Sequence, residues 1–176
     1  MISTKLEIAI RDIADFPKPG IVFKDITPIL KDASLCTKVI DAFVERLDGT
    51  AIDVIAGIES RGFLFGLMLA NRMNIPFVPI RKKGKLPFET VEEPCELEYG
   101  SAILELHTDA ILPGQRVLIH DDLLATGGTV NAATRLVKKL GGQVAGYAFV
   151  ISLDFLKAKE RLKQVSENIV TLVSFQ

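Results

Sequence analysis

The side chains best suited to binding or catalysis lie in residues 116–129, RVLIHDDLLATGGT. An apolar run ends there in two adjacent carboxylates, Asp121 and Asp122, and a turn of small residues follows before a helical pattern begins. Glycines in such a turn adopt backbone angles closed to other residues, so several N–H groups can point at one anion. The positive end of the next helix and the hydroxyls of Thr126 and Thr129 add to that attraction. The turn is therefore predicted to bind a phosphate monoester.

The two aspartates restrict which phosphate compound would fit. Carboxylates accept hydrogen bonds, and the vicinal hydroxyls of a sugar are two adjacent donors. A ribose phosphate would place its phosphate at Gly127 and Gly128 and its 2′- and 3′-hydroxyls at Asp121 and Asp122. The pattern is not a Walker A loop, because no lysine follows the glycines, and it is not a GxGxxG turn. A tight turn with a structural role alone would leave the two adjacent carboxylates unexplained.

The elements that must position this turn follow from the apolar pattern. Runs rich in valine and isoleucine, which are typical of buried parallel strands, are residues 52–57, 77–80, 116–120 and 144–151. Apolar residues at helical spacing mark residues 36–48 and 129–140. The alternation predicts an α/β fold in which helices flank a central, mostly parallel sheet. Ligands of such sheets bind beyond the carboxyl ends of the strands, where the phosphate turn must lie.

Length and composition indicate one ordinary globular domain over residues 1–176. The chain is 48% hydrophobic and 24% charged, with a net charge of −1, which argues against nucleic acid as the main partner. The longest uncharged apolar run, residues 62–71, is too short to span a membrane. The charged N-terminal sequence does not resemble a signal peptide, so we expect a cytoplasmic location. Cys36 and Cys95 have no spacing that suggests zinc or a disulfide framework.

Two segments interrupt the alternation. Residues 15–30 contain three prolines and a glycine, which exclude a long regular element. Residues 81–100, RKKGKLPFETVEEPCELEYG, begin with four basic residues in five and then turn acidic. Long loops inside compact domains are usually lids, binding loops or disordered segments. A solvated loop without a function remains the alternative for residues 81–100.

Five segments together resemble a known enzyme family. The signature with which type I phosphoribosyltransferases bind 5-phosphoribosyl pyrophosphate (PRPP) is similar to VLIHDDLLATGGT. Segments of the adenine phosphoribosyltransferases resemble FPKPGIVFKDITPIL, IAGIESRGFLFG, IRKKGKLP and LEYG, in the same order. The resemblance implies the type I phosphoribosyltransferase fold, with a flexible lid loop at residues 81–100 and a small base-binding hood that includes residues 15–30. The implied reaction transfers the phosphoribosyl group of PRPP to N9 of adenine, giving AMP and pyrophosphate for purine salvage.

The resemblance also implies roles for individual residues. Those expected to bind PRPP and AMP are Asp121, Asp122, Ala125, Thr126, Gly127, Gly128 and Thr129. Those expected around the pyrophosphate are Ser60, Arg61, Arg81, Lys83 and Lys85. Adenine is expected to contact main-chain groups of Val22 and Lys24, the ring of Phe23 and, on its opposite face, Leu153. Glu98 is the expected acid/base, with Tyr99 of the lid over the site.

Cofactor and assembly follow from the same resemblance. No cluster of carboxylates or histidines forms a metal cage, so Mg²⁺ is expected to arrive with PRPP and not on a direct protein site. A homodimer is expected. Four other glutamates of the same segment compete with Glu98 for the acid/base role, namely Glu89, Glu92, Glu93 and Glu96. His107 and His120 are not expected to act as bases.

Three alternative functions are compatible with parts of the pattern. An enzyme of the same superfamily could use xanthine or hypoxanthine, and competition between bases would reveal it. A nucleotide-sensing regulator could retain the PRPP site without catalysis, although no helix-turn-helix or basic extension is visible. An unrelated phosphosugar enzyme, such as an isomerase, would not need the aspartate pair beside the phosphate turn.

Overall fold

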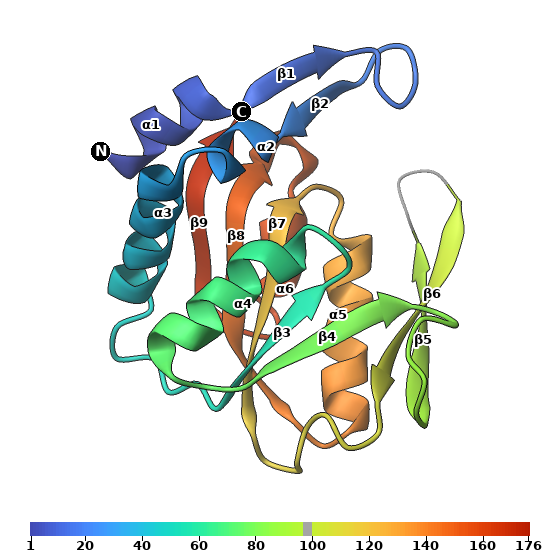
Figure 1. Cartoon of the computed structure of the whole chain (residues 1–176). Coiled ribbons are helices and arrows are strands. Elements are labelled where there is room, and N and C mark those ends of the chain that lie inside the picture. Colours follow the sequence, from blue (N-terminus) through green and yellow to red (C-terminus); the bar gives the residue numbers. More distant parts are fainter. Residues whose placement is uncertain (97–99) are drawn as a thin grey trace.

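The computed structural model describes residues 1–96 and 100–176. Its centre is a seven-stranded sheet with the strand order β5-β6-β4-β3-β7-β8-β9 (Figure 1). The strands are β3 (Val54–Ile58), β4 (Phe77–Lys82), β5 (Thr90–Glu96), β6 (Ser101–His107), β7 (Arg116–Leu124), β8 (Gln143–Leu153) and β9 (Ile169–Phe175). The five strands from β4 to β9 in this order are parallel, whereas β6 pairs antiparallel with both β4 and β5. The predicted α/β fold with a mostly parallel sheet is confirmed.

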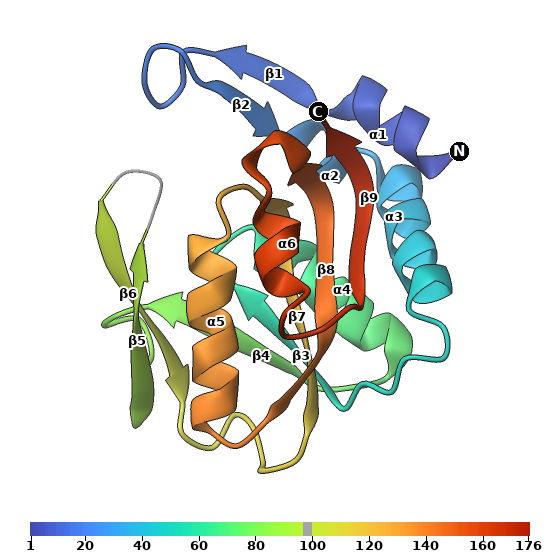
Figure 2. The ribbon, with the colours of Figure 1, turned by 180° about the vertical axis from the view of Figure 1, so that it is seen from behind.

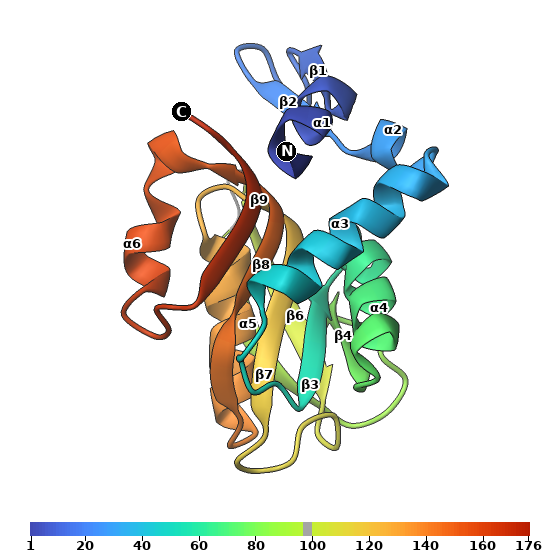
Figure 3. The ribbon, with the colours of Figure 1, turned by 90° about the vertical axis from the view of Figure 1, so that its left-hand side faces the viewer.

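Helices cover both faces of the sheet (Figure 3). The helices are α1 (Ile2–Ala9), α2 (Thr27–Leu30), α3 (Ala33–Arg46), α4 (Gly62–Met73), α5 (Gly128–Lys139) and α6 (Ala158–Leu162), with a 3-10 turn at Asp154–Leu156. Side chains alternate between the two faces of a strand. On β7, Leu118 packs in the core that contains Phe43 of α3, whereas Val117 and Ile119 pack in the core that contains Leu136 of α5. The central strand is therefore buried on both sides.

The six predicted strands and helices lie close to their predicted positions, although β7 is longer than expected. Helix α3 begins at Ala33, where the carboxylate of Asp32 accepts a hydrogen bond from the backbone N–H of Leu35 at 2.9 Å. Strand β7 continues through the two aspartates to Leu124, beyond the predicted end at residue 120. Pairing with the long strand β8, which reaches Leu153, supports this extension. The aspartates thus have a fixed strand backbone. No helix in the described ranges has the length and apolar character needed to cross a membrane.

The N-terminal region forms a hood beyond the carboxyl end of the sheet. Strands β1 (Arg11–Ala14) and β2 (Val22–Asp25) pair antiparallel as a separate two-stranded sheet. Figure 2 shows this hairpin above the ends of β7 and β8. Residues 15–30 contain only the short elements β2 and α2, as their prolines and glycine predicted.

Residues 81–100 differ from the irregular loop that their composition predicted. Strand β4 continues to Lys82, and β5 pairs with β6 from Thr90↔His107 to Glu96↔Ser101. Glu93 of this charged strand forms ion pairs with Arg135 and Lys139 of α5, both at 2.8 Å. We call β5 and β6 together the β5–β6 arm. The lid remains a prediction, and its residues Glu98 and Tyr99 lie outside the described part of the chain.

Candidate active site

The phosphate turn lies between β7 and α5, as predicted. Gly127 has a φ of +85°, in the left-handed region that glycine adopts without strain. Helix α5 begins at the next residue, so its first N–H groups and its positive end face the turn. A β-carbon on Gly128 would overlap the carbonyl oxygen of Glu96, so the end of β5 lies directly against this turn. The turn can hold an anion, and the β5–β6 arm lies beside it.

A cavity of about 370 Å³ opens at this turn. The residues that line it are Glu59, Ser60, Arg61, Lys82, Ala102, Leu104, Asp121, Asp122, Leu123, Leu124, Ala125, Thr126, Gly127, Thr129 and Val130. They come from three places that are distant in sequence: the turn after β3, the basic end of β4 with β6, and the β7–α5 turn. The structure therefore brings together every residue predicted to bind PRPP and AMP except Gly128, along with Ser60 and Arg61 of the predicted pyrophosphate set.

The aspartate pair is held in an environment that disfavours its charge. Asp122 is 3% exposed, and Asp121 is partly exposed. The backbone N–H of Asp122 donates to Oδ1 of Asp121 at 2.8 Å. Burial, followed by the charge of Asp122, holds the pKa of the Asp121 carboxyl well above its usual range. Burial also raises the pKa of Asp122, although the Arg61 guanidinium opposes that effect. Hydrogen-bond donors from a ligand would stabilise both carboxylates.

Arg61 joins this cavity to a second one. Its Nε lies 3.0 Å from Oδ2 of Asp122, and its guanidinium carbon lies 4.8 Å from the centre of the Phe23 ring. The second cavity, of about 710 Å³, lies between the hood and the C-terminal strands. It shares Arg61, Leu123 and Ala125 with the first cavity. A ligand with two ends could therefore occupy both cavities at once.

The residues predicted to bind adenine line this second cavity. Val22, Phe23 and Lys24 belong to β2 of the hood, and Leu153 ends β8 on the facing side. Lys24 is held in place by Asp12, whose carboxylate oxygens lie 2.7 and 2.8 Å from its Nζ. Its charge is thereby matched without a ligand.

The basic residues at the end of β4 are arranged differently from the prediction. Among the described residues, Lys82 lines the first cavity, whereas Arg81, Lys83 and Lys85 do not. The guanidinium of Arg81 contacts Glu59 at 3.3 and 3.4 Å, and Lys83 Nζ contacts Glu92 at 2.8 Å. The run of basic residues gives no sign of which side chain faces the cavity, so Lys82 was missed. Successive side chains of a strand point to opposite faces, so Lys82 faces away from Arg81, which contacts Glu59. That alternation is the signal that could have identified Lys82.

Neither histidine is placed to act in the cavities. His120 is fully buried on β7, with the Phe43 ring edge-on at 5.4 Å. Burial lowers the pKa of His120 to about 4, against a smaller opposing effect of the Ala148 backbone. It is therefore neutral at physiological pH. His107, on β6, lies beside the ring of Phe88 at 6.1 Å. Within the described residues, neither side chain lines a cavity of the site.

Comparison with known proteins agrees with this geometry. The family model for the phosphoribosyl transferase domain matches residues 26–176. The chain belongs to the phosphoribosyltransferase family. It is 50% identical over 175 residues to the adenine phosphoribosyltransferase of Cytophaga hutchinsonii, covering 99% of this chain and 97% of that protein. Within the family, it therefore belongs with the adenine phosphoribosyltransferases.

Two solved structures support the same placement. The adenine phosphoribosyltransferase of Thermoanaerobacter pseudethanolicus has a TM-score of 0.94 and 49% identity, covering 99% of this chain and 100% of that one. The enzyme of Saccharomyces cerevisiae, complexed with adenine and D-2,5-dideoxy-2,5-imino-altritol 1,6-bisphosphate, has a TM-score of 0.90 and 42% identity, covering 97% and 98%. The predicted fold and family are both confirmed.

Proposed function

We propose that this chain transfers the phosphoribosyl group of PRPP to adenine, giving AMP and pyrophosphate in purine salvage. The observation that carries the proposal is the pair of adjoining cavities that share Arg61. The first cavity combines a phosphate turn with two carboxylates suited to ribose hydroxyls, and the second is bounded by the backbone of β2. The relative from Saccharomyces cerevisiae was solved with adenine bound, which supports a base in the equivalent place here.

The base would be recognised by the main chain of the hood. Adenine presents a donor at N6 beside an acceptor at N1, whereas hypoxanthine and guanine present the reverse pair. A fixed carbonyl and a fixed N–H of Val22 and Lys24 can therefore distinguish them. Phe23 and Leu153 would hold the two faces of the ring. A mismatched base would leave buried main-chain groups unpaired, which is costly.

Mg²⁺ fits this site as an ion that accompanies PRPP. The ion keeps several water ligands and binds through one or two carboxylates together with substrate phosphates. No group of three His, Cys, Asp or Glu side chains capable of holding a metal occurs in residues 1–96 and 100–176. Asp121 and Asp122 line the cavity, where they would hold the ribose hydroxyls of the PRPP that carries the ion. When bound, Mg²⁺ would offset the negative charge of the departing pyrophosphate.

The protein's contribution to the reaction would be electrostatic. The bond between C1 of PRPP and the pyrophosphate oxygen breaks, both electrons leave with pyrophosphate, and adenine N9 bonds to C1. Arg61 and Lys82, together with the predicted Arg81, Lys83 and Lys85, would stabilise the leaving group, while Ser60 and the turn's N–H groups hold the phosphates. The N9 proton would pass to the carboxylate of Glu98, with Tyr99 covering the site and excluding water.

Assembly as a homodimer is part of the proposal. Helix α4 exposes Leu64, Leu67 and Met68, which are 43%, 57% and 39% exposed. Residues three and four apart lie on the same side of a helix, and an exposed apolar patch of this kind usually marks an interface. A second copy of the chain is the proposed partner.

A cytoplasmic location is also proposed. Cys36 and Cys95 are free and buried, and free cysteines are usual in reducing compartments, which supports this location.

One assay tests the proposed reaction. The purified chain, given PRPP, adenine and Mg²⁺, should form AMP, and chelation of the metal should stop it. Hypoxanthine and guanine should react roughly 10⁴-fold less efficiently, because sites that pair buried polar groups with a substrate reject mismatched analogues by about this factor. Comparable rates with hypoxanthine would contradict the adenine assignment and leave the family unaffected.

A further inference from the structure

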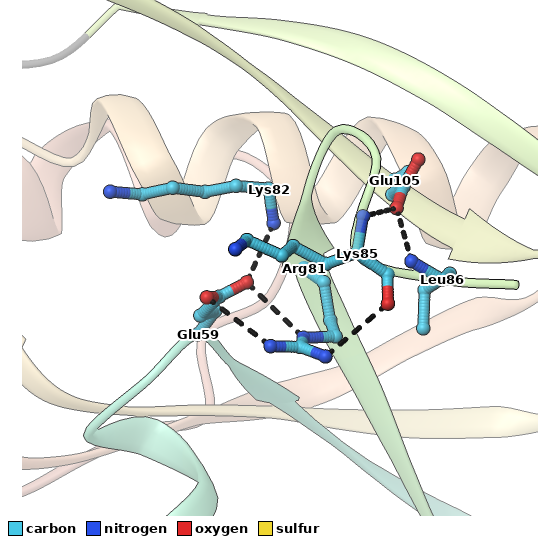
Figure 4. A network of polar contacts seen from close by, with 6 residues as sticks. All are labelled: Glu59, Arg81, Lys82, Lys85, Leu86 and Glu105. Atoms are coloured by element: carbon cyan, nitrogen blue, oxygen red, sulfur yellow. Dashed lines mark hydrogen bonds and ion pairs between the residues drawn. The ribbon is translucent and has the colours of Figure 1, made fainter.

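Glu105 is a buried carboxylate behind the pyrophosphate side of the first cavity. It lies on β6 between two strands, with Arg81 of β4 and Glu92 of β5 as its pairing neighbours. The residue is only 3% exposed. Its Oε1 accepts hydrogen bonds from the backbone N–H groups of Lys85 at 2.9 Å and Leu86 at 2.7 Å (Figure 4). Glu105 therefore holds the basic turn after β4, residues 83–86, through two of its backbone N–H groups.

The held turn continues into the wall of the cavity. The carbonyl oxygen of Lys85 accepts a hydrogen bond from Nη1 of Arg81 at 3.3 Å. The other side of the Arg81 guanidinium contacts Glu59, which also accepts the backbone N–H of Lys82 at 2.9 Å. Figure 4 shows the side chain of Lys82 leaving this network in the opposite direction from the turn. A continuous set of contacts thus connects Glu105, through Lys85 and Arg81, to Glu59.

The charge of Glu105 is compensated by the turn itself. Burial favours the neutral acid, yet the backbone N–H groups of Leu86, Gly84 and Lys85 outweigh it and hold the pKa of Glu105 below its usual range. Hydrogen bonds to an ionised acceptor are about twice as strong as those between neutral groups. An apolar side chain at this position would leave the N–H groups of the turn without their acceptor, and the turn would move to hydrate them.

We propose that Glu105 is a positioning residue for the pyrophosphate end of PRPP, an inference that rests on the proposed function. It acts through the turn at residues 83–86, which fixes Arg81 against Glu59 and so sets the place of Lys82 on the cavity wall. Glu105 does not touch the substrate. Its effect is limited to the pyrophosphate side, because neither the phosphate turn nor the hood is part of this network.

The two ligands of the reaction separate this role from general stability. PRPP carries the pyrophosphate, whereas AMP binds without one and needs only the phosphate turn, the aspartates and the hood. Loss of Glu105 should therefore weaken PRPP and leave AMP unaffected. Outer hydrogen-bond partners that orient ligating groups at metal sites change affinity by about 10–100-fold when removed, and we expect an effect of that size on PRPP.

The test compares Glu105→Leu and Glu105→Gln with the wild type and with Glu167→Gln, which removes the same charge from an exposed residue that lines neither cavity of the site. Equilibrium binding of PRPP with Mg²⁺, and separately of AMP, is measured for each full-length protein, with thermal unfolding to monitor folding. Glu105→Leu should weaken PRPP about 10–100-fold with AMP affinity unchanged. Glu105→Gln retains an acceptor oxygen and should show a smaller effect in the same direction, which keeps the test valid if the leucine variant does not fold.

Two results would overturn the positioning role. One is equal weakening of PRPP and AMP in the glutamine variant, and the other is wild-type PRPP affinity in both variants. The proposed function fails by a different result, which is that the wild type forms no AMP from PRPP and adenine. The two failures are therefore distinguishable.

Discussion

His120 should make the folded protein sensitive to acid without contributing to catalysis. The residue is fully buried, and burial lowers its pKa to about 4 from the usual 6.5 of a histidine. A histidine with a lowered folded pKa is neutral in the native state while the unfolded chain takes up a proton. Its stabilising contribution is therefore complete above pH 6.5 and is lost as the pH falls from there towards 4. Replacement by leucine removes this dependence.

The size of the effect follows from the two pKa values. Each unit of difference corresponds to about 1.4 kcal/mol, so the full shift is about 3 kcal/mol. Integration of the proton uptake gives a loss of about 1.4 kcal/mol at about pH 5.5 and about 2.5 kcal/mol at about pH 4.5, relative to neutral pH. A loss of this size is a large part of the usual stability of a domain.

Denaturant unfolding of the wild type and of His120→Leu at several pH values measures this difference. Protein concentration must be held constant, because dimerisation would also affect the result. The wild type should lose stability faster than the variant below pH 6.5 by the amounts above, while both form AMP at similar rates at neutral pH. Parallel stability curves would refute the neutral buried state of His120. A large loss of activity in a folded variant would show that His120 acts in the reaction.

Three further outcomes test the site directly. Asp121→Asn and Asp122→Asn should each weaken PRPP and AMP by about 10–150-fold, since a hydrogen bond to a charged group contributes about 1.5–3 kcal/mol; unchanged affinity in the double variant, measured by calorimetry, would exclude the ribose role. Gly128→Ala should lower the free energy of unfolding by about 1–3 kcal/mol, because the new β-carbon overlaps the Glu96 carbonyl and overpacking costs about this much; an unchanged denaturant midpoint would argue against close contact between arm and turn. Glu98→Gln should lower turnover by about 10²–10⁴-fold while PRPP still binds, and near-normal kcat would remove Glu98 from the reaction.

Local chemistry explains why the phosphate turn could be predicted from sequence. A strand, two carboxylates, a turn of small residues and a helix follow one another directly, so their geometry depends on neighbouring residues. The hood was only partly predictable. Its prolines and glycine exclude long elements, but the pairing of Ile13 with Phe23 that forms the hairpin has no local signal.

The β5–β6 arm shows what sequence patterns lack. Its charged residues favour a solvated loop when read alone, whereas in the fold β5 pairs with β6 and Glu93 contacts Arg135, which is 42 positions away. The position of Lys82 on the cavity wall depends likewise on Glu59, which precedes it by 23 residues. Both features depend on contacts between residues that are far apart in the sequence.

The aspartate pair and His120 lie on the same strand, but their contributions to stability change in opposite directions with pH. A carboxyl whose folded pKa is raised contributes stability below its unfolded pKa and loses it as the pH rises through the folded value. At neutral pH, the burial of Asp121 and Asp122 therefore opposes folding, and Arg61 offsets only part of this effect. A ligand whose hydroxyls donate to both carboxylates would stabilise the native state, and the stabilisation would increase with its concentration and affinity. The feature that weakens the free protein is thus the one that would give it affinity for the proposed ribose phosphate.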